Sequence, residues 1–99
     1  PKWKITAHDG IYKTSIEMFN SRTDVEWYEI GVFDNDWKPI RFVTSYRIFK
    51  LEYLSATKFD VYINEKDKNR AEYICSKSKL KGIGEDKPMV ESRICSRFK

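Results

Sequence analysis

Short runs of alternating apolar and polar residues are the feature that most limits how this chain can fold. Apolar side chains recur at every second position in six or seven segments, and turn-forming residues separate the segments. They lie at residues 3–7, 12–19, 25–33, 37–43, 46–51, 58–63 and 71–76. A period of two is typical of half-buried β-strands, and no long helical window competes with it. We therefore predict an all-β fold, an antiparallel sandwich or barrel.

The chain has 99 residues, which fits one domain. We expect the core strands to lie within 2–76. A polar stretch with two glycines and a proline predicts a loop or linker over 77–90, followed by a last strand or tail over 91–99. The turns at 20–24, 34–39 and 64–70, together with 77–90, are the candidate contact loops.

Composition argues against most catalytic and metal-dependent functions. One histidine and two cysteines leave little material for a metal site or a nucleophile–base pair, so we expect no enzyme activity, metal or cofactor. The mean hydropathy of −0.66 and the lack of a long apolar run also predict no membrane insertion.

Cys75 and Cys95 are the two cysteines, and they lie twenty residues apart. An oxidising compartment would allow one disulfide between them, whereas a reducing compartment would keep two free thiols. The first alternative predicts an extracellular, cell-surface or secreted protein. The second predicts an intracellular one.

The basic excess lies in the C-terminal third. Residues 1–64 carry nine basic and nine acidic side chains, so residues 65–99, with ten against six, hold the whole net charge of +4. A candidate basic binding face consists of Lys77, Lys79, Lys81, Arg93 and Arg97. On a strand, the three lysines would share one face and bind a polyanion such as nucleic acid or sulfated polysaccharide. The same charges also suit solubility and the protection of an edge strand.

The three tryptophans differ in their sequence context. Trp3 and Trp27 fall on strand patterns and are predicted to lie in the core, whereas Trp37 lies beside a turn. We therefore take Trp37 as the candidate exposed contact aromatic.

Two resemblances refine the predicted fold. The passage 49–63 resembles the corner between strands E and F of fibronectin type III domains, in which Leu54 would plug the core. Ser55 and Ala56 stand where that family has proline and glycine. Phe59 replaces its tyrosine, so the hydroxyl of a tyrosine corner is missing.

The second resemblance is to immunoglobulin domains. Residues 69–75 are similar to their strand F signature, 25–28 to the tryptophan passage of strand C, and 90–98 would be strand G. The position that should hold the strand B cysteine falls near Met18, so this register leaves Cys75 free or paired with Cys95.

Both resemblances imply an Ig-like β-sandwich of about seven strands. They further imply a non-enzymatic protein–protein interaction module of the kind found in receptors, adhesion molecules and viral decoys. The alternative function is that of a basic-surface binder of nucleic acid or sulfated polysaccharide.

Overall fold

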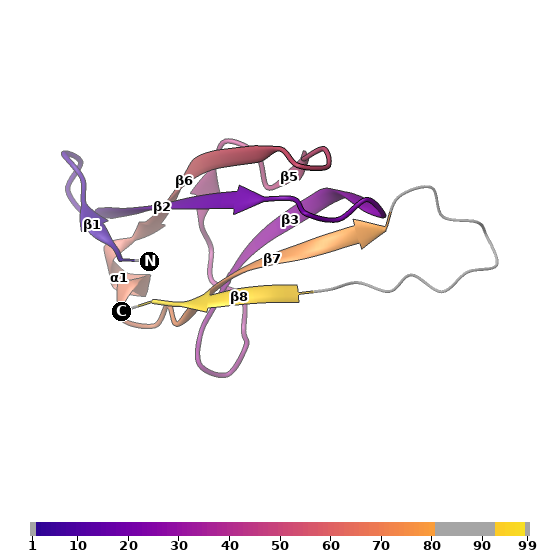
Figure 1. Ribbon diagram of the computed structural model, residues 1–99. Coiled ribbons are helices and arrows are strands. Elements are labelled where there is room, and N and C mark those ends of the chain that lie inside the picture. Colours follow the sequence, from indigo (N-terminus) through magenta and orange to yellow (C-terminus); the bar gives the residue numbers. More distant parts are fainter. Residues whose placement is uncertain (1, 81–92, 99) are drawn as a thin grey trace.

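The computed structural model describes residues 2–80 and 93–98, which form two antiparallel sheets of four strands each (Figure 1). The strand order is β1-β2-β6-β4 in the first sheet and β5-β3-β7-β8 in the second. The predicted all-β sandwich is therefore confirmed. The strands are β1 (Lys4–Ile5), β2 (Ile11–Phe19), β3 (Val25–Phe33), β4 (Val43–Thr44), β5 (Ile48–Lys50), β6 (Ala56–Asn64), β7 (Tyr73–Leu80) and β8 (Arg93–Arg97).

Several element boundaries differ from the sequence pattern. β7 continues through Leu80, so the segment expected to be a loop from residue 77 begins as a strand, and 81–90 lies outside the described residues. The polar stretch 64–70 contains one helical turn, α1 (Glu65–Lys68), because the Asn64 side chain accepts a hydrogen bond from the Lys66 N–H and caps it. Within the described residues, no helix is long and apolar enough to cross a membrane.

The segment 37–43 does not form the single short strand that its pattern suggests. Trp37 adopts a positive φ of 63° in the turn, and Pro39 forms only an isolated bridge with Phe33. The Ile40 N–H then donates to the Val32 carbonyl, after which the chain crosses to the first sheet and pairs there as β4. It returns to the second sheet at Arg47, whose carbonyl accepts from the Ile30 N–H.

The core lies between the sheets and is formed by the alternate side chains of the strands that point inward. Ile30, Val32 and Ile74 of the second sheet meet Val61 and Ile63 of the first. Ile40 and Phe42, on the crossing segment, complete this cluster.

The prediction that Trp27 lies in the core is wrong, because its side chain is 43% exposed. Its neighbour Tyr28 takes the inward position and is buried, so alternation turns Trp27 to the outer face of the sheet. An aromatic strand pattern alone gave no basis for choosing between these two rings.

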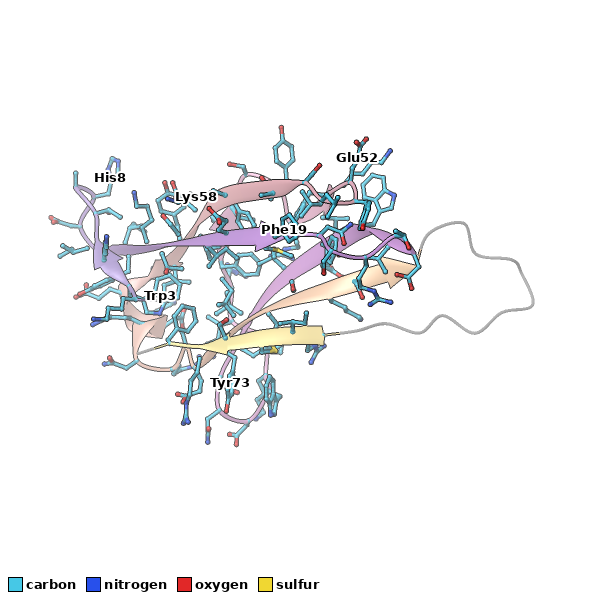
Figure 2. All side chains as sticks on the ribbon, in the orientation of Figure 1. Trp3, His8, Phe19, Glu52, Lys58 and Tyr73 are labelled. Carbon is cyan, nitrogen blue, oxygen red and sulfur yellow. A yellow bond between two sulfur atoms is a disulfide. The ribbon has the colours of Figure 1, made fainter. Side chains whose placement is uncertain are left out.

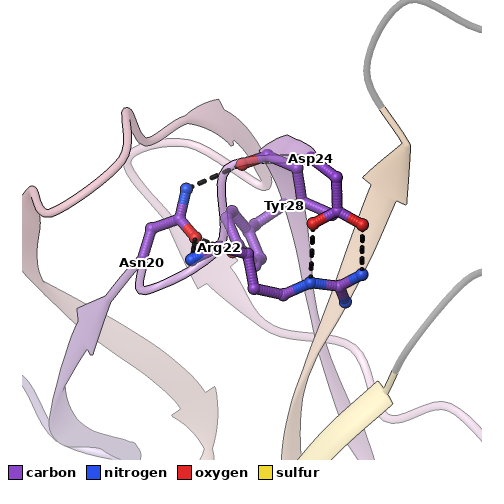
Figure 3. Close-up of polar contacts among 5 residues, drawn as sticks. Asn20, Arg22, Asp24 and Tyr28 are labelled. Atoms are coloured by element: carbon purple, nitrogen blue, oxygen red, sulfur yellow. Dashed lines mark hydrogen bonds and ion pairs between the residues drawn. The ribbon is translucent and has the colours of Figure 1, made fainter.

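Asn20 is a fully buried polar residue that ties three segments together (Figure 3). Its amide nitrogen donates to the carbonyls of Val25 and Leu51, and its side-chain oxygen accepts from the Arg22 N–H and the Tyr28 hydroxyl at 2.7 Å. Burial raises the pKa of Tyr28, so the phenol stays protonated and can donate. All four hydrogen-bonding positions of the amide are thus used.

The corner before β6 also depends on Asn20. The Leu54 N–H donates to the Asn20 carbonyl, and the Asn20 N–H donates to the Ser55 carbonyl. Leu54 does not plug the core as the fibronectin resemblance implies, because it has a φ of 62° and is 60% exposed. Leu51 is the buried residue of this corner.

We expect Asn20→Ala to lower the free energy of unfolding by about 3 kcal/mol, because it strands two buried carbonyls and the Tyr28 hydroxyl. Tyr28→Phe is the matched control. It removes one donor while Asn20 keeps its bond to Arg22, so about 1 kcal/mol should be lost. Urea unfolding of both variants measures the difference, and equal losses would contradict this account of Asn20.

β8 is held only weakly by the core. Cys95 is half-buried, and the other four residues are exposed. Its attachment to β7 comes from backbone pairing and from the disulfide between Cys75 and Cys95, which face each other in register with a Cα–Cα distance of 4.0 Å. The disulfide alternative of the sequence analysis is the one that the structure contains.

Replacing both cysteines by alanine should therefore release β8 more than any other strand. The disulfide closes a loop with a sequence separation of 20. Chain entropy then predicts a loss of about 3 kcal/mol in the free energy of unfolding. Urea unfolding of the double variant, with the reduced native protein as a second comparison, measures it. Amide hydrogen exchange should become faster in β8 first. Faster exchange in the other strands with unchanged exchange in β8 would contradict this account.

Candidate interaction surfaces

The outer face of the second sheet carries three cross-strand rows of residues from β3, β7 and β8. Figure 2 shows Tyr73 on this face, directed away from β2. The rows are Glu29–Lys77–Arg93, Gly31–Cys75–Cys95 and Phe33–Tyr73–Arg97. The first row is charged, the second holds the disulfide, and the third holds aromatic rings beside an arginine.

Gly31 is the low point of this face. A Cβ placed there would lie 2.8 Å from Cε2 of Phe33, so the Phe33 ring already occupies the space of a side chain. The Arg93 guanidinium carbon lies 4.9 Å from the centroid of that ring. Arg93 thus reaches from β8 across β7 toward β3, and the contact is a cation–π interaction.

Two arginines of the crossing segment reach the same place from the other side. Arg41 and Arg47 line a cleft of about 460 Å³ together with Gly31, Phe33 and Arg93. We call this the arginine cleft. Four basic residues, which include Lys77, and one acidic residue, Glu29, line the cleft. The net charge of its lining is therefore +3, in a chain whose net charge is +4.

An aromatic platform adjoins the arginine cleft. Trp37 stacks on Tyr73 with ring centroids 4.2 Å apart and an interplanar angle of 6°, yet it remains 47% exposed. Arg97 lies 6.0 Å from the Tyr73 ring centroid and forms an ion pair with Glu72, whose hydrogen bond raises the pKa of the guanidinium. Trp37 thus lies at the surface, where the sequence context placed it.

The structure brings together only part of the basic face expected from the sequence. Lys77 and Arg93 are cross-strand neighbours in the arginine cleft, whereas Arg97 belongs to the aromatic row. Lys79 lies opposite Trp27 in β7, and Lys81 lies outside the described residues.

Arg41 and Arg47 are the residues of this cleft that sequence reasoning missed. They lie in two segments, 37–43 and 46–51, that the sequence pattern predicts only as strands. No local signal could place them opposite Arg93, because their position depends on the crossing between the two sheets.

A second surface lies on the flank between β2 of the first sheet and β8 of the second sheet. A groove of about 260 Å³ opens between them, lined by Ile16, Met18, Phe19 and Ile94 among others. We call it the flank groove. Ile94 has the inward parity of β8, since it pairs with Ser76, yet it is 72% exposed. Ile94 is therefore left uncovered at this flank by the residues that the structure describes.

The backbone of β8 is also open along this flank. β8 pairs with β7 and with no other strand in the described parts of the chain. Phe98 donates its N–H to the Glu72 carbonyl, which shows that even-numbered residues point their amides toward β7. The close Cα–Cα distance of 4.0 Å at Cys75–Cys95 is that of a non-hydrogen-bonded pair. The N–H and C=O groups of Arg93, Cys95 and Arg97 hence face outward.

Comparison with known proteins finds similarity in structure but not in sequence. The sequence matches no protein-family model and no curated protein. The fold is similar to the crystal structure of the E. coli chaperone DraB, with a TM-score of 0.60 and 17% sequence identity. The match covers 87% of this chain and 45% of DraB, so the chain spans less than half of that protein's length. The likeness confirms the β-sandwich.

Gly31→Ala tests the geometry of the outer face. The added methyl group must displace the far end of the Phe33 ring, which can rotate, so stability should fall by only about 1 kcal/mol. The Arg93 guanidinium should lose its aromatic partner at the same time. NMR shifts of the Phe33 ring protons and of the Arg93 Nε–H measure the displacement, and unchanged signals would contradict the packing described.

Proposed function

We propose that this chain is a non-enzymatic protein-binding module that takes up an extended segment of its partner as an additional strand beside β8. One observation carries the proposal. The edge strand β8 has backbone groups that point outward, and its own residue Ile94 has inward parity but is exposed. Exposed edges of this kind pair readily with another chain, and strand addition is a common mode of peptide recognition.

The backbone of β8 would supply the affinity. Its five residues give an edge about 16 Å long, and Arg93, Cys95 and Arg97 each present one donor and one acceptor. The disulfide fixes the middle of this edge, so little order is lost when a partner pairs with it.

The flank groove would supply the selectivity. Alternate side chains of an added strand point between the sheets, where they would cover Ile16, Met18 and Ile94. The partner segment should therefore alternate apolar and polar residues. Arg93 and Arg97 on the other side of β8 would disfavour a second basic strand.

The strand order supports membership of the Ig-like superfamily. The order β1-β2-β6 corresponds to strands A-B-E and β3-β7-β8 to strands C-F-G, whereas β4, at the D position, precedes β5, at the C′ position, which reverses the usual chain order of those two strands. Because β6 pairs with β2 and β7 pairs with β3, the pairing favours the immunoglobulin register, in which 69–75 leads into strand F. A receptor, adhesion or decoy role is in keeping with that superfamily.

The proposal includes an oxidising location. The Cys75–Cys95 disulfide supports an extracellular, cell-surface or secreted protein, since reducing compartments keep such thiols unpaired.

A library of random twelve-residue peptides, selected on the immobilised oxidised protein, tests the binding mode. We expect the selected peptides to alternate apolar residues and to bind Ile94→Asp at least about tenfold more weakly, because the aspartate places a charge in the flank groove. Ile48→Asp is the matched control. It changes an exposed isoleucine on β5, the opposite edge of the same sheet, and should leave affinity unchanged.

Two results would overturn the proposal. Selected peptides could bind the Ile94→Asp variant as tightly as the native protein, or they could lose affinity only with Ile48→Asp. The second result would move the binding edge to β5. Both substitutions are at exposed positions, so thermal unfolding should verify that the two variants remain folded.

A further inference from the structure

The arginine cleft holds three guanidinium groups that have no ion-pair partner among the described residues, although Glu29 also lines the cleft. Arg41, Arg47 and Arg93 form no ion pair within residues 2–80 and 93–98. Elsewhere the chain pairs its arginines, as Arg22 with Asp24 and Arg97 with Glu72. Cations that line one cleft repel one another, so their arrangement is most favourable when an anion lies in the cleft.

The fold sets these groups on opposite walls of one cleft. Arg41 and Arg47 mark the points where the chain leaves the second sheet and returns to it, on the β5 side of β3. Arg93 comes from β8, on the far side of β7. Between the walls lies Gly31, which is covered by the Phe33 ring on which Arg93 stacks.

Two of the three guanidinium groups are held in place by aromatic rings. The Arg47 carbon lies 4.7 Å from the Phe42 ring centroid, and the Arg93 carbon lies 4.9 Å from that of Phe33. Such stacking leaves the N–H groups at the edges of the guanidinium plane free to donate. The arrangement is suited to an oxyanion that accepts several bonds at once.

We propose that the arginine cleft binds a tetrahedral oxyanion, the phosphoryl or sulfuryl group of a larger ligand. A cleft of about 460 Å³ is much larger than one such group, so the remainder of the ligand can extend toward the exposed face of Trp37. This site goes beyond the proposed function, because it lies on the outer face of the sheet and uses neither Ile94 nor the flank groove.

The test uses four small probes with the oxidised native protein: inorganic phosphate, inorganic sulfate, glucose 6-phosphate and glucose 6-sulfate. NMR titration should show saturable shifts of the Nε–H signals of Arg41, Arg47 and Arg93. Tighter binding of the phosphate ester assigns the site to phosphoryl groups, and tighter binding of the sulfate ester assigns it to sulfuryl groups. Either order supports the proposal.

Two double variants distinguish binding in the arginine cleft from attraction by the overall positive charge of the protein. Arg41→Gln/Arg47→Gln removes one wall of the cleft and should weaken binding at least about tenfold. Lys4→Gln/Lys13→Gln removes the same charge from a cross-strand pair of lysines on the first sheet and should leave binding unchanged. Arg93→Gln, on the opposite wall, gives an independent second variant.

The proposal is overturned if no probe produces saturable shifts at the three arginines. It is equally overturned if both double variants lose affinity by the same factor, since the attraction would then belong to the whole surface. The flank-groove variant Ile94→Asp should bind the four probes as the native protein does, so this test and the peptide test fail separately.

Discussion

The Cys75–Cys95 disulfide is the interaction on which both proposed surfaces depend. β8 buries little apolar surface, so the hydrophobic effect that holds β3, β6 and β7 contributes little to its attachment. The disulfide instead fixes the centre of β8 against β7, and the stack of Trp3 on Phe98 lies just beyond its end. Without β8 in place, the flank groove loses Ile94 and the arginine cleft loses Arg93.

The alternation of a single strand explains how β8 serves two surfaces. Ile94 and Ser96 have inward parity and face the flank groove, whereas Arg93 and Arg97 lie on the outer face of the sheet. A strand added beside β8 would lie in the plane of the sheet, so the arginine cleft above it would stay open. The two proposed sites are therefore compatible in one molecule.

The strands could be predicted from the sequence, but their partners could not. Alternation in residues such as Ile30 and Val32 reflects a local physical requirement, namely that one strand face is buried. The position of Arg41 and Arg47 depends instead on a crossing between sheets, and the role of Asn20 depends on carbonyls at Val25 and Leu51 that only the folded chain brings near. Trp27 was misplaced because parity, rather than side-chain size, decides which face is buried.

Amide hydrogen exchange along β8 tests the central claim most directly. In the free oxidised protein, the amides of Ile94, Ser96 and Phe98 should exchange slowly because they donate toward β7, whereas those of Cys95 and Arg97 should exchange rapidly. Addition of a selected peptide should slow exchange at Cys95 and Arg97 without changing the alternation elsewhere. Slow exchange at these two amides before any peptide is added, or no slowing when it binds, would contradict an open edge that takes up a partner strand.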